Sequence, residues 1–182
     1  MTIGITGTNG AGKGTVVDYL VQKGFTHYSA RDFLTAEAKR RGLPINRNSM
    51  RETGNSLRKE YGSSFIAEQL FAQAQATGGD AVIESVRSLG EADFLRENGV
   101  VLFAVNADRK LRYERSARRG SRTDDVSFET WVAQEEREWH NEATHDMNVP
   151  GVMALADYIF ENNGSLEELH KQVDAQLRQA KK

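Results

Sequence analysis

The sequence contains no cysteine, which excludes a disulfide framework and any metal site built on thiolates. It has no excess of basic residues either: the formal net charge is −2 and the pI about 6.1, so no positive field suggests a nucleic-acid partner. No basic segment followed by an apolar one opens the chain, and the longest apolar stretch, residues 99–107, is too short to span a bilayer. We therefore expect a soluble, cytoplasmic protein without a membrane or nucleic-acid partner.

The 182 residues are enough for one domain with a sizeable core and too few for two ordinary ones. Apolar runs alternate along the chain with segments of helical periodicity, whereas residues 140–151 carry no assignment. The runs predicted to be strands are 2–6, 25–29, 80–85, 100–107 and 157–162. Apolar strands that alternate with helices indicate a parallel sheet covered on both faces. We expect one α/β domain, residues 1–182, with three layers and a five-stranded parallel sheet.

The most informative stretch is GTNGAGKGT, residues 7–15, between the first predicted strand and the first predicted helix. Glycines let backbone N–H groups converge on an anion, and the helix N-terminus adds the positive end of its dipole. Lys13 supplies a mobile charge for the β- and γ-phosphates, and a nearby hydroxyl serves phosphate or Mg²⁺. The strict pattern puts that hydroxyl at position 14, which is glycine here, so Thr15 is the candidate. The residues expected to hold ATP are Gly7, Asn9, Gly10, Ala11, Gly12, Lys13, Gly14 and Thr15.

This GxxGxGKGT form resembles that of adenylate kinase and the related nucleoside monophosphate kinases. The segment YSARDFLTAEAKRRG, residues 28–42, is similar to the part of those kinases that begins the acceptor site. The segment ALADYIFENNGSLEELHKQVDAQL, residues 154–177, instead resembles the end of dephospho-CoA kinase. Both families belong to the P-loop kinase superfamily, and an archaeal group of adenylate-kinase-related proteins combines these features in a similar layout.

On the acceptor side, the resemblance implies a helical acceptor-binding region at about 31–78. It puts Glu84 at the end of a strand near the water shell of Mg²⁺, and Arg87 on the acceptor phosphate. The spacing between these two is one residue shorter than in adenylate kinase. Thr35 stands where adenylate kinase has a phosphate-binding arginine, and Arg31 is the candidate substitute.

On the donor side, the resemblance implies that Lys13 contacts the transferred phosphoryl group and that a short lid spans about 115–145. Arg115 and Arg119 lie four residues apart on a predicted helix, so they share a face at the hinge of this lid, and Arg122 follows the turn. Lid arginines can add positive charge when the lid closes over the donor. Asn163 and Gly164 resemble the loop that lies against the donor adenine.

Three functions remain open at this point. The favoured one is transfer of the γ-phosphoryl group of ATP, with Mg²⁺, to a nucleoside or deoxynucleoside monophosphate. The second is a dephospho-CoA kinase, in which Asp32 acts as general base toward a ribose 3′-hydroxyl. The third is a regulatory protein that binds a nucleotide without transferring phosphate. The arginines on the acceptor side favour the first, while the acceptor and the oligomeric state are not determined by the sequence.

Overall fold

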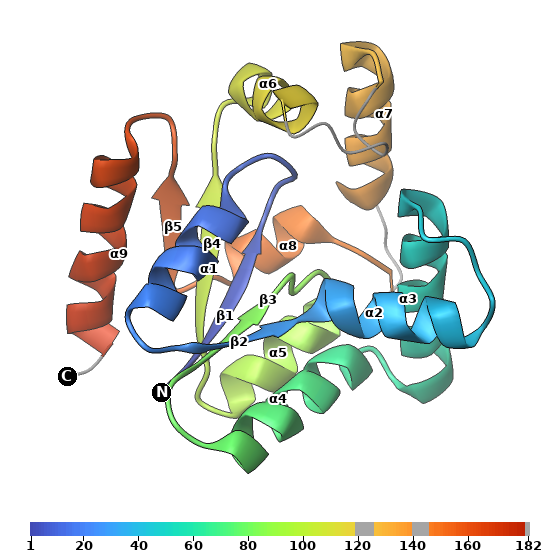
Figure 1. The fold of residues 1–182 in the computed structure, drawn as a ribbon, viewed down its shortest axis with the longest axis horizontal. Helices are drawn as coiled ribbons and strands as arrows, with labels where there is room; N and C mark the ends of the chain where they lie inside the picture. The colour runs from blue at the N-terminus through green and yellow to red at the C-terminus, as the bar shows by residue number, and fades with distance from the viewer. Residues whose placement is uncertain (119–125, 140–145, 181–182) are drawn as a thin grey trace.

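Five parallel strands form one sheet in the computed structural model, which describes residues 1–118, 126–139 and 146–180 (Figure 1). The strands are β1 (Thr2–Gly7), β2 (Thr26–Ser29), β3 (Ala81–Glu84), β4 (Val101–Asn106) and β5 (Tyr158–Glu161). Their order across the sheet is β2-β3-β1-β4-β5, and all four pairings are parallel. Each predicted strand is confirmed, and β1 occupies the centre of the sheet.

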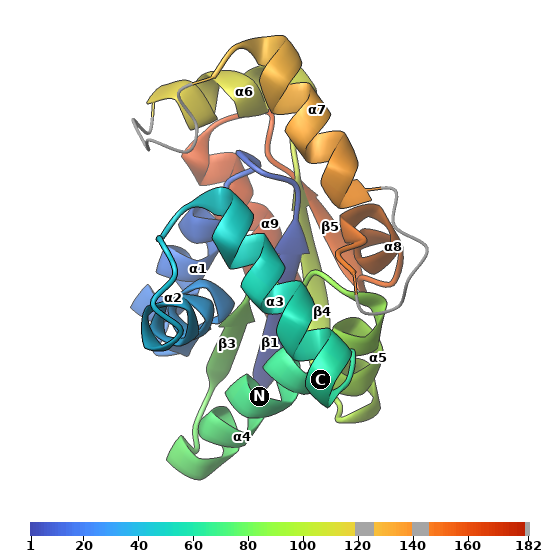
Figure 2. The same cartoon turned by 90° about the vertical axis from the view of Figure 1, so that its right-hand side faces the viewer.

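Helices cover both faces of the sheet, so the predicted three-layer α/β architecture is confirmed (Figures 1 and 2). The described helices are α1 (Lys13–Gln22), α2 (Ala30–Arg40), α3 (Arg47–Tyr61), α4 (Phe65–Thr77), α5 (Leu89–Glu97), α6 (Arg109–Arg118), α7 (Phe128–Trp139), α8 (Val149–Ala154) and α9 (Leu166–Ala180). Helices α1 and α9 pack on one face, and α4, α5 and α8 on the other. Over the described residues, no helix combines the length and the apolar character needed to cross a bilayer.

Alternation of side chains along the strands divides the core into two halves. Val82 and Phe103 point toward α1 and α9, and the Phe103 ring meets that of Phe160 edge-on with centroids 5.0 Å apart. The neighbouring Ile83 and Leu102 point toward α4 and α5. Because both faces are covered, every residue of a central strand can be apolar, which explains the unbroken apolar runs in the sequence.

Helix α8 begins within residues 140–151, for which the sequence carries no assignment. It is short, and the Asn148 side chain caps its start by accepting a hydrogen bond from the Gly151 N–H at 2.9 Å. Val149 and Val152 are its buried residues. A helix of this length shows less than two turns of apolar periodicity, and it therefore escapes detection by pattern.

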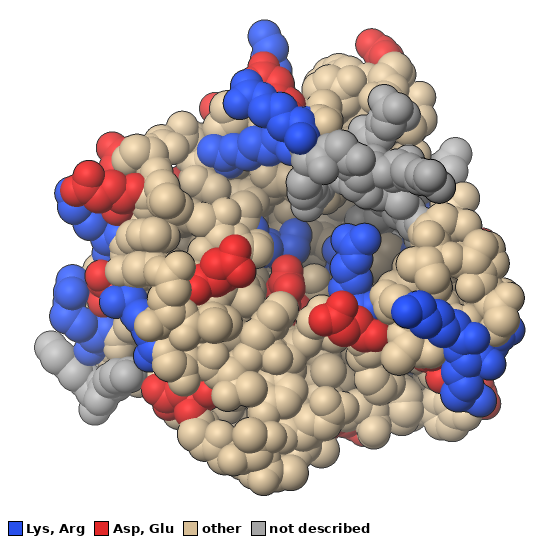
Figure 3. Space-filling view, in the orientation of Figure 1, with Lys and Arg blue, Asp and Glu red and all other residues tan. Residues whose placement is uncertain are grey.

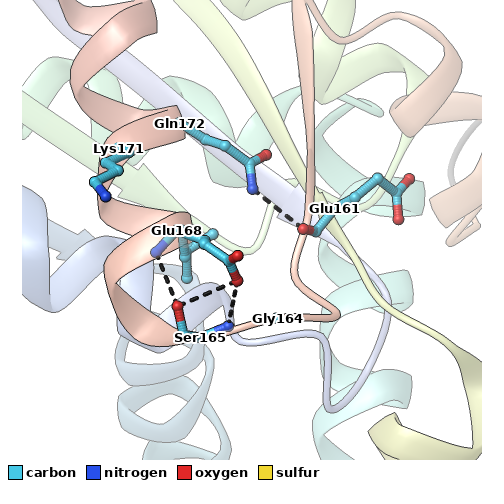
Figure 4. A pocket seen from close by; sticks show the side chains of 7 residues that line it. Glu161, Gly164, Ser165, Glu168, Lys171 and Gln172 are labelled. Atoms are coloured by element: carbon cyan, nitrogen blue, oxygen red, sulfur yellow. Dashed lines mark hydrogen bonds between the residues drawn. The ribbon is translucent and has the colours of Figure 1, made fainter.

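The start of α9 is fixed by a reciprocal cap between Ser165 and Glu168 (Figure 4). The Ser165 N–H donates to the Glu168 carboxylate at 2.7 Å, and the Glu168 N–H donates to the Ser165 hydroxyl at 3.2 Å. Two N–H groups that the helix leaves without partners are thereby satisfied. This cap sets the direction in which the chain leaves β5.

We expect the substitution Ser165→Ala to lower the free energy of unfolding by about 1 kcal/mol, because one half of the cap is lost. Urea denaturation followed by circular dichroism measures this. The control is Gln179→Ala, at an exposed position near the end of the same helix, where alanine is at least as favourable as glutamine. Equal stability of the Ser165→Ala and wild-type proteins would contradict the assigned role of the cap.

Candidate functional site

The carboxyl ends of the five strands meet at one edge of the sheet, and the predicted site residues gather there. Glu84 of β3 lies in register beside Ile5 of β1 and Ser29 of β2, and Gly7 of β1 lies beside Val105 of β4. The surface is hollowed above this edge, between α6 and α2, and both basic and acidic side chains line the hollow (Figure 3). The loop that follows β1 therefore emerges at the middle of this edge.

The glycines of the loop at residues 7–12 are required by its backbone and by its close neighbours. Gly10 and Gly12 have φ angles of 77° and 101°, which side-chain-bearing residues rarely adopt. A Cβ atom at Gly10 would lie 2.2 Å from the Arg112 carbonyl oxygen, and one at Gly12 would lie 2.3 Å from Nδ2 of Asn162. The first turn of α1 contains no acidic residue, so its N–H groups and dipole remain suited to an anion.

Lys13 folds back over this loop. Its Nζ atom donates to the carbonyl oxygens of Gly7 and Thr8, both at 2.9 Å. Gly14 is exposed, with nothing within 4 Å of the position that a Cβ atom would occupy, whereas Thr15 is half-buried on the next position of α1. The end of the loop and the first turn of α1 thus carry the Lys13 ammonium group and the Thr15 hydroxyl.

Two side chains that the sequence analysis missed hold the loop from outside. Arg112 of α6 is 3% exposed, donates to the Asn9 carbonyl at 3.3 Å, and forms a bidentate ion pair with Glu135 of α7. Asn162, which follows β5, donates from Nδ2 to the Ala11 carbonyl at 2.7 Å. The tip of the loop is therefore fixed by groups far away in the sequence, and no local pattern could have revealed them.

Of the predicted lid arginines, the structure describes Arg115. Arg115 of α6 donates from Nη1 to the Asn162 carbonyl at 2.9 Å, which directs its guanidinium toward the segment after β5. Arg119 and Arg122 lie outside the described residues. Helix α7, within the predicted lid, packs on α6 through edge-on contacts of Tyr113 with Phe128 and Trp131.

The segment predicted to face adenine, Asn163 and Gly164, lies between β5 and α9 in the chain and contacts the start of α6. Asn163 accepts a hydrogen bond from the Asp108 N–H at 2.8 Å, and this contact ties the start of α6 to the segment after β5. Gly164 lines a shallow pocket of about 410 Å³ on the side of α9 (Figure 4). The Glu168 carboxylate in that pocket is already used by the cap of α9.

Glu84 pairs with a histidine that the sequence analysis did not single out. Nε2 of His27 lies 3.0 Å from Oε2 of Glu84. Burial alone would raise the pKa of the Glu84 carboxyl, but the His27 hydrogen bond and nearby positive charges lower it overall. Those charges belong to Lys13 and Arg87. His27 therefore contacts the carboxylate at the end of β3, and the charges of Lys13 and Arg87 act on it.

Arg87 stands on a tightly held turn after β3. Its N–H donates to the Glu91 carboxylate at 2.8 Å, and its carbonyl accepts from the Asn148 N–H at 2.8 Å. On the same edge, Arg31 and Asp32 are exposed in the first turn of α2. Asp32 donates its backbone N–H to the Ser29 hydroxyl at 3.1 Å, and the charge of its carboxylate acts on His27.

Thr35, where adenylate kinase has an arginine, bonds back to its own helix. Its hydroxyl donates to the Arg31 carbonyl at 2.7 Å. The hydroxyl also lies 3.9 Å from the sulfur of Met50 in α3, and Arg31 stays the candidate cation of α2.

Comparison with known proteins identifies the family. A family model described as an AAA domain matches residues 3–148. The UPF0200 protein TK1334 of Thermococcus kodakarensis is 33% identical over 180 residues, which cover 95% of this chain and 94% of the relative. The UPF0200 protein MJ1399 of Methanocaldococcus jannaschii is 30% identical over 98% of this chain and 90% of its own length. The chain belongs to the UPF0200 family and carries an AAA domain.

Solved structures similar to this UPF0200 chain include small-molecule kinases. Shikimate kinase from Bacteroides thetaiotaomicron aligns over 98% of each chain with a TM-score of 0.59 and 14% identity. A gluconokinase from Sinorhizobium meliloti aligns over 98% of this chain and 91% of its own, with a TM-score of 0.55 and 16% identity. TT1252 from Thermus thermophilus aligns over 98% and 97% with a TM-score of 0.62 and 22% identity. At these identities the likeness concerns the fold, which is that of the P-loop kinases.

The contact with Glu84 raises the pKa of His27 above its ordinary value of 6.5, and the charges of Asp32 and Asp18 add to the effect. A raised pKa means that the pair stabilises the fold fully below pH 6.5 and that this contribution is lost as the pH rises through the pKa of the folded state. We expect Glu84→Gln to lower the pKa of His27 toward its ordinary value, because the negative charge is removed.

Proton NMR of the His27 ring across pH 5–9 measures this pKa. The control variant is Glu161→Gln, at the exposed end of β5. It changes the net charge by the same amount and should leave the pKa of His27 unchanged. A wild-type midpoint at or below pH 6.5 would show that the ion pair does not form in solution.

Proposed function

We propose that the chain is an ATP-dependent phosphotransferase that moves the γ-phosphoryl group of ATP to a nucleoside or deoxynucleoside monophosphate. The observation that carries this proposal is the convergence of an anion-binding loop with two cationic side chains at one sheet edge. Lys13 belongs to the loop and Arg87 follows β3, and the charges of both act on Glu84 at the end of that strand. A donor phosphate on the loop and an acceptor phosphate at Arg87 would share one charged centre.

The loop suits an anion in backbone conformation and charge. Gly10 and Gly12 adopt φ angles that side-chain-bearing residues rarely adopt, and the carbonyl contacts of Lys13 can be exchanged for phosphate oxygens by rotation of the side chain. Thr15 and Glu84 are the residues that would hold Mg²⁺, Glu84 through water. The ion, when bound, neutralises charge on the transferred group.

The choice of acceptor depends on what the acceptor side offers. A phosphate acceptor is already nucleophilic and needs cations for binding, whereas a hydroxyl acceptor needs a general base. Arg87 has its backbone fixed on both sides, at its N–H and at its carbonyl. Asp32, the candidate base, is exposed in the first turn of α2, where the Ser29 hydroxyl holds its backbone N–H. This contrast favours a monophosphate over dephospho-CoA, which remains the second candidate.

A regulatory protein that binds ATP without transferring phosphate is the candidate from another class. It would need the loop and Lys13 but not Arg87. The two classes are therefore separated by turnover and by the effect of Arg87 substitutions.

We expect Lys13→Ala to reduce phosphoryl transfer by about 100-fold or more, because a positive charge directed at the transferred group is removed. The assay combines ATP and Mg²⁺ with a panel of ribo- and deoxynucleoside monophosphates and dephospho-CoA. The control is Lys23→Ala, which removes a lysine that pairs with Asp174 at the far end of α1.

Phosphorylation of one monophosphate, lost in Lys13→Ala and retained in Lys23→Ala, is the result we expect. Phosphorylation of dephospho-CoA alone would transfer the proposal to the second candidate. ATP binding without turnover on the whole panel would support the regulatory function instead.

The roles of Arg87 and Asp32 are separated by neutral variants. We expect Arg87→Met to lower kcat/KM for the acceptor by about 100-fold, since a charge-assisted contact to phosphate is lost. Asp32→Asn should change kcat by less than about tenfold, whereas loss of a general base costs about 10²- to 10⁴-fold. Steady-state kinetics with the acceptor varied at saturating ATP gives both values, and a reversed ranking would argue for a hydroxyl acceptor.

A further inference from the structure

A buried ion pair joins the predicted acceptor region to the turn that carries Arg87. Nε of Arg58, in α3, lies 2.8 Å from Oε1 of Glu91, in α5. The two side chains are 3% and 2% exposed. Neither residue was predicted from the sequence to have a functional role, and the pair lies well inside the protein.

The second oxygen of Glu91 holds the backbone of the Arg87 turn. Oε2 accepts the N–H of Arg87 at 2.8 Å and the N–H of Ser88 at 3.1 Å. The Glu91 N–H in return donates to the Ser88 hydroxyl at 3.3 Å. A capping box explains the contacts with Ser88 but not the contact with Arg87 or the ion pair with Arg58. The carboxylate therefore bridges a guanidinium on one side and the Arg87 backbone on the other.

The turn needs such support because it begins in an unfavourable conformation. Ser85 has a φ angle of 72°, and it is the one residue other than glycine with positive φ in the part of the chain that the structure describes. The N–H groups of Ser85 and Val86 both donate to the Ile5 carbonyl, at 2.9 and 3.1 Å, so the chain bulges where β3 ends. Strained backbone of this kind persists only where its surroundings fix it, and Glu91 provides this on the far side of the bulge.

Helix α3 determines where the Arg58 guanidinium sits. The Leu34 side chain of α2 packs against Gly54 of α3, with Cδ1 3.5 Å from the position of a Cβ atom there, and Nη1 of Arg58 lies 3.2 Å from the same position. Nη1 also donates to Oδ1 of Asn55 at 3.3 Å. A shift of α3 relative to the sheet would therefore move the guanidinium and, with it, the Glu91 carboxylate.

Stability alone does not account for this pair. Removal of two charges from water is costly, and replacement of a buried ion pair by apolar residues is often neutral or stabilising. We propose that Arg58 and Glu91 are positioning residues, which couple the packing of α3 in the acceptor region to the placement of Arg87 at the strand ends. The kinetic effect of this coupling rests on the proposed function, whereas its effect on the backbone of the Arg87 turn does not depend on that function.

The variant that tests the coupling is Arg58→Met, which keeps the volume of the side chain and leaves the capping box of α5 intact. We expect the amide protons of Arg87 and Ser88 to exchange with solvent about tenfold faster or more, while those of β1 stay protected. NMR-detected hydrogen exchange measures this without any substrate. The matched control is Lys59→Met, at the exposed neighbouring position of α3. Unchanged exchange at Arg87 and Ser88 would overturn the coupling.

The second experiment measures steady-state kinetics with the acceptor that the phosphoryl-transfer assay identifies. We expect Arg58→Met to raise the acceptor KM by about 10- to 100-fold, as for a misplaced binding group, with the affinity for ATP unchanged. Arg58→Lys should restore part of the affinity. In an Arg87→Met background the same substitution should have no further effect, because Arg58 acts through Arg87. Additive effects of the two substitutions, or an equal loss of ATP affinity, would overturn the proposal.

Two further outcomes are an unstable Arg58→Met variant and a panel without any phosphorylated acceptor. If Arg58→Met is too unstable to study, the double variant Arg58→Met/Glu91→Gln removes both charges, and it should fold while keeping the fast exchange at Arg87. Protected amides in that folded double variant would overturn the coupling. If no acceptor in the panel is phosphorylated, the proposed function fails, and the exchange experiment still decides on the coupling.

Discussion

Parallel pairing of β1 with both β3 and β4 determines where everything else in the site can lie. Because β1 is central, the loop after it is flanked by the end of β3 on one side and by the end of β4 on the other. Glu84 is thereby brought beside the loop although it lies 69 residues after Thr15 in the chain. The helices that cover the two faces leave this edge open, and basic and acidic side chains line the hollow there (Figure 3).

The core alone does not hold the loops of this edge in place, and buried arginines take part in doing so. Arg112 connects the Asn9 carbonyl with Glu135 of α7, and Arg58 connects α3 with Glu91 and the turn of Arg87. Guanidinium suits both positions because its planar donors reach several acceptors at fixed angles. The first pair borders the loop that we propose for the donor, and the second borders the turn that we propose for the acceptor.

Sequence reasoning recovered what depends on local pattern. The strands were predictable because both faces of the sheet are covered. Lys13 was a candidate from the glycine-rich motif, and Glu84 and Arg87 were candidates from the resemblance to nucleoside monophosphate kinases. His27, Asn162 and the two buried ion pairs were not, because their partners lie far away in the sequence and follow no period. The roles of the predicted site residues stay predictions, those of Lys13, Glu84 and Arg87 included, as does the division into acceptor and lid regions.

The Glu84 carboxylate allows the positively charged Lys13 and Arg87 to lie at the same edge of the sheet. Lys13 and Arg87 belong to different elements, and His27 gains a proton more readily because Glu84 is close. Without a negative charge among them, the cations would repel one another and the edge would not stay preorganised. The charges of Asp32 and Asp18 also act on His27, so both signs of charge are present along this edge. The carboxylates thereby help to keep Lys13 and Arg87 at the strand ends, where the proposed function needs their charge for phosphate groups.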